Sequence, residues 1–242
     1  DPVTGAYRGL LLEGARSNTA LYSAAHASFW TANSATLSNL AVNALGIFPG
    51  LNIGSTGATW HRGTTSVRLI ANTPQTITAY YRSGTSGALR FAISGDAGLI
   101  TIQGTAGALT VSNTDFGAIS NLTQVVLKDG LTHRLRFTFT STASGSYQIG
   151  GGPRSAVSGQ TVEMYAVQAE AGSIASSYIP SVATEGSRDA DRISLPLLTG
   201  TNDLLLEYEG GQTAEYAAVS GPAPQLAAPP SGRLLKITAT PR

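Results

Sequence analysis

Residues 131–140 read Leu-Thr-His-Arg-Leu-Arg-Phe-Thr-Phe-Thr. Apolar side chains and one histidine occupy the odd positions, while threonine and arginine occupy the even positions. A period of two places alternate side chains on opposite faces of a β-strand. The stretch therefore predicts a strand with one face in a hydrophobic core. His133 shares the apolar face, so we interpret it as a buried or half-buried structural residue.

Similar short runs recur along the chain and predict an all-β protein. They span residues 64–71, 75–82, 88–93, 99–102, 108–111, 122–128 and 161–170. Turn sequences separate them, and Asp129-Gly130 between two apolar runs is a hairpin signal. Many short strands at this spacing favour a two-sheet antiparallel jelly-roll sandwich. The run at 161–170 is apolar on both faces, which is typical of a central strand. Residues 32–58 lack such a pattern and are predicted to form long surface loops.

Composition excludes several other classes of protein. Of 242 residues, 12% are charged and 28 are glycine, which argues against a solvated helical protein and against charge-driven disorder. The net charge of +1 gives no electrostatic footprint for nucleic acid. Cysteine is absent, so disulfides and cysteine-ligated metals are excluded. We find no signal-peptide pattern at Asp1 and no apolar run long enough to insert into a membrane.

The pattern changes after Pro196, which suggests two parts. Residues 1–196 are predicted to form the jelly roll, and residues 197–242 a small C-terminal β appendage. Three further strands are expected in the appendage, at 204–209, 213–219 and 233–240, with a Pro/Ala/Gly-rich loop at 220–232. So short a segment buries too little core to be stable alone. We therefore expect it to pack on the main domain or on a neighbouring subunit.

Two motifs frame the predicted jelly roll. The opening motif, residues 9–18, reads GLLLEGARSN, and the closing motif, residues 162–196, reads VEMYAVQAEAGSIASSYIPSVATEGSRDADRISLP. Together they resemble the edges of a jelly-roll module of bacteriophage tail-fibre and head-spike proteins, whose members open with "GLLIE-ARTNLL" and close with "QLE-G…SYIPT…TR-AD". Residues 76–82 resemble the "YTFSVYAK" strand of that family. Residues 127–134 fall at its "D-G-WYR" segment, with Leu131 and His133 in place of the usual aromatics. The phrase DPVTG at the start commonly lies inside longer relatives, so we expect this chain to be part of a larger protein.

The resemblance covers residues 1–196 and implies a concanavalin-like or carbohydrate-binding-module-like jelly roll on a virion surface. The expected function is non-catalytic attachment of a phage or phage-like particle to host surface polysaccharide, either capsule or lipopolysaccharide. Its other partners would be virion proteins, and homo-oligomeric or multicopy display would raise avidity. Two alternatives remain open: a structural virion decoration or connector protein without a ligand, and a glycan depolymerase acting outside the cell.

Motifs of several enzyme classes are missing. The chain has no G-x-S-x-G, H-E-x-x-H, P-loop or G-x-G-x-x-G sequence. A glycosidase would need two carboxylates on either side of the scissile bond, and sequence alone pairs none. Glu13 and Glu170 lie in the two motifs and are interpreted, with Gln168, as buried hydrogen-bonding groups that join the sheet edges. We therefore expect a protein that is not an enzyme.

Sugar binding needs an aromatic face against the pyranose ring and polar groups for the hydroxyls. The candidate carbohydrate-binding residues are Trp60, His61, Arg62, Tyr80, Arg82, Arg90 and Tyr147. The first three are consecutive in a Gly/Thr-rich segment. Strand periodicity points Tyr80, Arg82 and Arg90 outward, so they would form a cationic patch for an acidic polysaccharide if their strands adjoin; the alternative is an ordinary solvated sheet face. Trp30 is assigned to the core.

No cofactor is expected from the sequence. Related jelly-roll modules often hold a structural calcium ion, which binds six to eight oxygen ligands. Glu13, Asn18 and Glu170 could contribute such oxygens here. No dense Asp/Asn loop is present, so the metal site stays unassigned.

Overall fold

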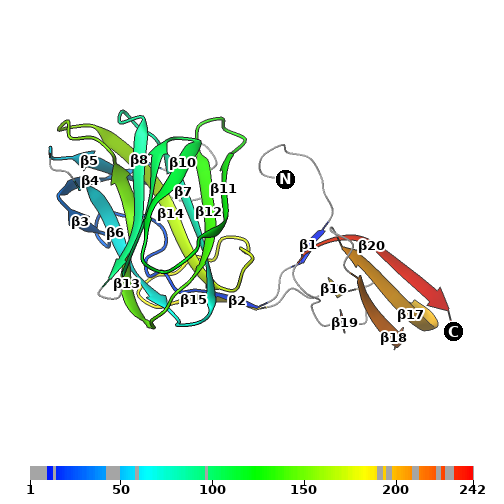
Figure 1. The fold of residues 1–242 in the computed structure, drawn as a ribbon. Coiled ribbons are helices and arrows are strands. Elements are labelled where there is room, and N and C mark those ends of the chain that lie inside the picture. Colours follow the sequence, from blue (N-terminus) through cyan, green and yellow to red (C-terminus); the bar gives the residue numbers. More distant parts are fainter. Residues whose placement is uncertain are drawn as a thin grey trace. The chain divides into compact units, whose positions relative to one another are not determined.

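The computed structural model describes residues 10–12, 15–41, 50–57, 60–95, 98–189, 193–194, 198–208, 213–221, 225–226 and 232–241. Over these residues the chain forms strands, turns and loops and no helix (Figure 1), which confirms the all-β prediction. Accordingly, none of them belongs to a helix long and apolar enough to cross a membrane. The chain divides into two compact units, Ser17–Ser187 and a unit of Val3–Arg16 with Arg188–Arg242. The division at Ser187–Arg188 differs from the boundary expected after Pro196, and the segment Val3–Arg16 groups with the C-terminal segment.

The first unit is a two-sheet antiparallel jelly-roll sandwich (Figure 1). Sheet I contains, in spatial order, β10 (Ala108–Thr114), β9 (Gly98–Thr105), β8 (Ala88–Gly95), β13 (Gly145–Pro153), β6 (Arg62–Leu69) and β3 (Thr31–Asn33). Sheet II contains β11 (Ser120–Val126), β12 (His133–Thr140), β7 (Pro74–Arg82), β14 (Thr161–Ala171), β5 (Gly50–Ser55) and β4 (Ala35–Leu40).

The core lies between the two sheets. Phe91 of sheet I meets Phe137 of sheet II edge-on, with ring centroids 6.1 Å apart. On β12 the odd residues from Leu135 onward are buried, as the alternation predicts. His133 is half-buried and stacks on the buried ring of Tyr81 at 5.2 Å, which confirms its structural role. Strand β14 is buried on both faces along most of its length, as expected of a central strand.

Two segments differ from the prediction. Residues 32–58, expected to be surface loops, contain β4, β5 and part of β3, and Leu51 and Ile53 are fully buried. Strand β13 was not predicted, because its run of glycines carries no apolar–polar alternation.

The segment that follows the opening motif hydrogen-bonds to both sheets of the sandwich. The main-chain nitrogen of Leu21 donates to the Ser66 oxygen of sheet I (2.8 Å), and the nitrogen of Thr19 donates to the Ala169 oxygen of sheet II (2.8 Å). One short stretch of chain therefore pairs with β6 and with β14 where their shorter neighbours β3 and β5 have ended.

Asn18 connects the opening motif to the closing motif. Its side chain is fully buried. Its Oδ1 accepts hydrogen bonds from the main-chain nitrogens of Ala20 (3.1 Å) and Ala169 (3.0 Å), and its Nδ2 donates to the Ile179 oxygen (2.8 Å). The amide thereby joins three stretches of backbone.

Gln168 and Glu170 continue this buried network. Gln168 Oε1 accepts from the Ile179 nitrogen (2.6 Å), and its Nε2 donates to Glu170 Oε2 (2.7 Å). Glu170 also accepts from the nitrogen and the hydroxyl of Ser176. The structural interpretation of Gln168 and Glu170 is thus confirmed; Glu13 lies outside the described residues.

Two glycines of β13 allow it to approach β6 closely. A Cβ added at Gly150 would overlap the main-chain oxygen of Gly63, and one added at Gly152 would overlap that of His61. The close approach of the two backbones therefore requires glycine at both positions. The outer face of sheet I consequently has a strip without side chains there.

Substituting Gly150 with alanine should lower the free energy of unfolding by about 1–3 kcal/mol, because the two strands must separate to admit the methyl group. Chemical denaturation would measure the change. The control is Gly145→Ala, because a Cβ at Gly145 would lie 3.7 Å from the Tyr147 ring, which is an ordinary contact. Gly87 is unsuitable as a control because its φ is positive. A Gly150→Ala variant as stable as Gly145→Ala would contradict the account of β13.

The second unit contains a four-stranded antiparallel sheet in the order β1–β20–β17–β18. Its strands are β1 (Leu10–Leu12), β20 (Gly232–Pro241), β17 (Leu198–Tyr208) and β18 (Thr213–Gly221). The short strands β16 (Ile193–Ser194) and β19 (Gln225–Leu226) pair with each other. Strands β2 (Arg16–Asn18) and β15 (Gly186–Arg188) also pair with each other, and most of their residues belong to the first unit. Three strands were predicted after Pro196 and are present, but the pairing of β1 with β20 was not foreseen.

Candidate functional site

The outer face of sheet I carries the candidate site. On β6 the odd-numbered residues 63–69 face the core. The even-numbered residues 62–68 therefore face outward. On β8 the same alternation turns Arg90, Ala92 and Ser94 outward. Between these strands runs β13 with Gly150 and Gly152, so the outer face has a side-chain-free strip between two polar rows.

Trp60 and two arginines meet on this face. The Trp60 side chain is 40% exposed. The guanidinium carbon of Arg90 lies 4.2 Å from the centroid of the Trp60 ring, and that of Arg62 lies 5.9 Å from it. Both distances are within the range of cation–π attraction. The structure therefore brings together three of the residues that the sequence nominated.

A pocket of about 450 Å³ opens beside this cluster. It is lined by Trp60, Arg62, Ser94, Gly95, Gly98, Leu99 and Asp115. Asp115 Oδ2 accepts a hydrogen bond from the Leu99 nitrogen (2.9 Å), which fixes the carboxylate at the pocket. A carboxylate has about four acceptor positions, so Asp115 retains capacity for a ligand hydroxyl.

Arg62 lines the pocket, and Arg90 lies beside it at the Trp60 ring. Nη1 of Arg62 is buried and has no hydrogen-bond partner among the described residues. Burial lowers the pKa of Arg62, and burial together with the charge of Arg154 lowers the pKa of Arg90. Both groups carry a positive charge at neutral pH, because the guanidinium group is not deprotonated in proteins. An anionic ligand group would therefore gain from both cations.

A hydrogen-bonded row of polar side chains lies next to the pocket on the same face. Thr64 Oγ1 donates to Gln148 Oε1 and accepts from Asn33 Nδ2, both at 3.0 Å. Gln148 Nε2 donates to Ser66 Oγ at 3.4 Å. Thr64 is fully buried, whereas Asn33, Ser66 and Gln148 are partly exposed and present a polar surface suited to hydroxyl-rich ligands.

The predicted patch of Tyr80, Arg82 and Arg90 is not formed. Tyr80 and Arg82 lie on β7 of sheet II, whereas Arg90 lies on β8 of sheet I. The chain changes sheets at residues 83–87, so these consecutive strands do not adjoin. The sequence predicted correctly which side chains of each strand face outward. It did not reveal that the two strands belong to different sheets.

Arg82 is held by its own neighbours. Its Nη2 pairs with Asp129 at 2.8 Å and its Nε donates to Thr132 Oγ1 at 3.0 Å. Its guanidinium carbon also lies 5.3 Å from the Tyr165 ring. Tyr80 is half-buried and meets Tyr178 edge-on at 6.5 Å. These contacts indicate structural roles for Tyr80 and Arg82.

Two other nominated residues are buried, which corrects the expectation that they lie on a ligand surface. His61 is 3% exposed, with Nε2 3.2 Å from Ser55 Oγ and Nδ1 2.9 Å from the Ser34 oxygen. Tyr147 faces the core because β13 alternates, and its ring packs on Phe116 at 5.5 Å. Trp30 is buried, as expected.

Sequence reasoning missed Ser94 and Asp115. Ser94 faces outward on β8 like Arg90, so a predicted strand that extended beyond residue 93 would have included it. Asp115 follows the last residue of β10, and no local pattern connects it to Trp60.

Asp129 contributes to the pH dependence of stability. It is 7% exposed, and burial raises its pKa, but hydrogen bonds from Thr132, Leu131 and Arg82 outweigh burial and hold the pKa of Asp129 well below its ordinary value. Because the unfolded pKa is about 3.9, the resulting stability is fully present above about pH 4 and is lost as the pH falls towards the folded pKa.

We expect Asp129→Asn to lower the free energy of unfolding by about 2–3 kcal/mol at pH 7 and by less near pH 2. Urea denaturation at both pH values measures this. The exposed carboxylate of Glu185 supplies a control, since Glu185→Gln should change stability by less than about 1 kcal/mol. If Asp129→Asn lowers the free energy of unfolding equally at both pH values, the lowered pKa of Asp129 does not contribute to stability.

Two of the three possible calcium ligands, Asn18 and Glu170, lie in the described part of the chain. No group of three or more His, Cys, Asp or Glu residues converges there. The oxygens of Asn18 and Glu170 accept protein hydrogen bonds, and Glu13 is not described.

The chain has no match among models of known protein families and no significant match among curated protein sequences. The fold and the outer face of sheet I therefore carry the functional argument. A jelly-roll sandwich presents a pocket lined by an exposed tryptophan, one arginine and one carboxylate, and a second arginine lies against the tryptophan ring.

Proposed function

We propose that this protein binds carbohydrate without cleaving it and attaches a phage or phage-like particle to polysaccharide of the host surface. The observation that carries the proposal is the exposed Trp60 ring, which lines a pocket and has Arg62 and Arg90 close to it. An aromatic face packs against the C–H face of a pyranose, and the surrounding polar groups bind its hydroxyls.

The charges favour an acidic polysaccharide over a neutral one. Arg62 and Arg90 are planar cations that bind carboxylates through paired hydrogen bonds. Asp115 is the one carboxylate among the described residues that line the pocket. Glycoside hydrolysis ordinarily uses two, so the pocket suits binding better than cleavage.

The particle context rests on the resemblance of the opening and closing motifs to phage tail-fibre and head-spike modules. On a virion surface many copies would act together, with other virion proteins as neighbours. Multivalent display would compensate for the modest affinity of an open site.

Purified protein displayed on beads should bind a panel of bacterial capsular and lipopolysaccharide glycans that includes carboxylated and neutral members. We expect saturable binding to carboxylated polymers, little binding to dextran, and an unchanged polymer length after incubation. Shortened polymers would favour the depolymerase alternative. No binding to any member would favour a structural virion protein.

A further inference from the structure

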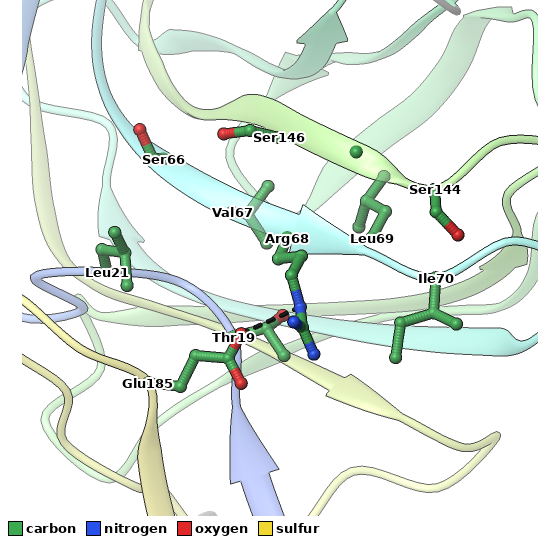
Figure 2. Close-up of a pocket in the computed structure, with 11 residues that line it drawn as sticks. Thr19, Leu21, Ser66, Val67, Arg68, Leu69, Ile70, Ser144, Ser146 and Glu185 are labelled. Atoms are coloured by element: carbon green, nitrogen blue, oxygen red, sulfur yellow. Dashed lines mark ion pairs between the residues drawn. The ribbon is translucent and has the colours of Figure 1, made fainter.

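A second pocket of about 560 Å³ lies along the same strand β6 (Figure 2). Among its lining residues are Ser66, Arg68, Ser144, Ser146, Leu21 and Glu185. Ser66 and Arg68 share the outward parity of Arg62, and Ser146 is paired with Arg68 across the ladder between β6 and β13. This pocket therefore opens on the outer face of sheet I as well.

An internal carboxylate already pairs with the arginine of this pocket. Arg68 Nε lies 3.0 Å from Glu185 Oε1 (Figure 2). The side chains are 63% and 35% exposed, respectively. Exposed ion pairs of this kind contribute little to stability, so another carboxylate can replace Glu185 at low cost.

The two pockets are connected by the polar row described above. Arg62 and Arg68 are six positions apart on one strand, which corresponds to about 20 Å. The partly exposed Gln148 and Ser66 lie between them on the outer face, and the two are hydrogen-bonded to each other. A ligand that reaches both arginines must therefore be an extended chain, longer than one sugar.

We infer that the Arg68 pocket is a second subsite for the same polysaccharide, that it binds a carboxylate of the chain, and that Glu185 holds this position until the ligand replaces it. The inference rests on the proposed function, because the first subsite is the Trp60 pocket. Occupying both subsites with one chain makes the second binding step intramolecular, so the protein should prefer polymers to short fragments.

The test uses the full chain and its variants Arg68→Gln and Glu185→Gln, with alginate, polygalacturonate, hyaluronate and polysialate as carboxylated probes. Methyl-esterified polygalacturonate is the matched probe without charge. Arg68→Gln should weaken binding of the preferred polymer about tenfold. Glu185→Gln should strengthen it about threefold, because it frees Arg68 from its internal partner. Neither variant should alter binding of disaccharides of the same polymer, which reach only the Trp60 pocket.

Thermal denaturation serves as the control for folding, and both variants should melt close to the wild type because the pair is exposed. If both variants bind the polymer as the wild type does while Trp60→Ala loses binding, the second subsite is refuted and the proposed function stands. If the wild type binds none of the carboxylated polymers, both are refuted.

Discussion

Replacing Asn18 with alanine should lower the free energy of unfolding by about 4 kcal/mol. The substitution removes three hydrogen bonds and leaves two main-chain N–H groups and one carbonyl buried without partners. Each unsatisfied buried group costs about 1–3 kcal/mol. The effect should be global, because Asn18 joins the start of the jelly roll to β14 and to the closing motif.

Equilibrium unfolding in urea, followed by circular dichroism, would measure this loss. Asn113→Ala is the matched control: Asn113 is an exposed residue of β10, and its substitution should change stability by less than about 0.5 kcal/mol. If Asn18→Ala unfolds at the same urea concentration as Asn113→Ala, the buried network does not hold the two motifs together.

Replacing Trp60 with alanine should weaken polysaccharide binding by about 30-fold, or about 2 kcal/mol, without unfolding the domain. The ring supplies the stacking surface, and its loss also removes the group against which Arg62 and Arg90 are placed. Its 40% exposure means that little core packing is lost.

Titration calorimetry with the polymer selected from the panel would measure the change in affinity. Trp60→Phe should retain part of it, because an aromatic face remains. Phe29→Ala removes another exposed ring, 53% exposed and stacked on Tyr22, and should leave affinity unchanged. Unaltered affinity in Trp60→Ala would remove Trp60 from the binding site.

Local patterns predicted the strands well where side chains alternate. Residues 131–140 gave the position and the inward face of β12, and residues 75–82 correctly placed Tyr81 inward and Tyr80 outward. Strand β13 escaped notice because glycines lack the side chains that make a pattern visible. Its glycines are explained only by the close approach of β6, which is a property of the folded backbone.

The candidate site could be predicted only in part, for a related reason. Trp60 and Arg62 are two positions apart in sequence, so the sequence alone indicated that they lie close together. Arg90 lies near them because β13 pairs with both β8 and β6. Asp115 follows the end of β10 and lines the same pocket as Trp60 and Arg62. Which strands share a sheet depends on long-range pairing, and this is why Tyr80 and Arg82 were grouped with Arg90 although they lie on the other sheet.

The most direct test of the central claim is a fluorescence titration with the carboxylated polysaccharides. The chain has two tryptophans: Trp30 is buried, with Nε1 bonded to the Tyr22 oxygen at 2.9 Å, and Trp60 is exposed at the proposed site. We predict a saturable change in tryptophan emission in the wild type that is absent in Trp60→Phe, where Trp30 alone reports. Polysaccharide binding with no change in Trp60 emission, or no binding at all, would contradict the assignment of this face as the carbohydrate-binding site.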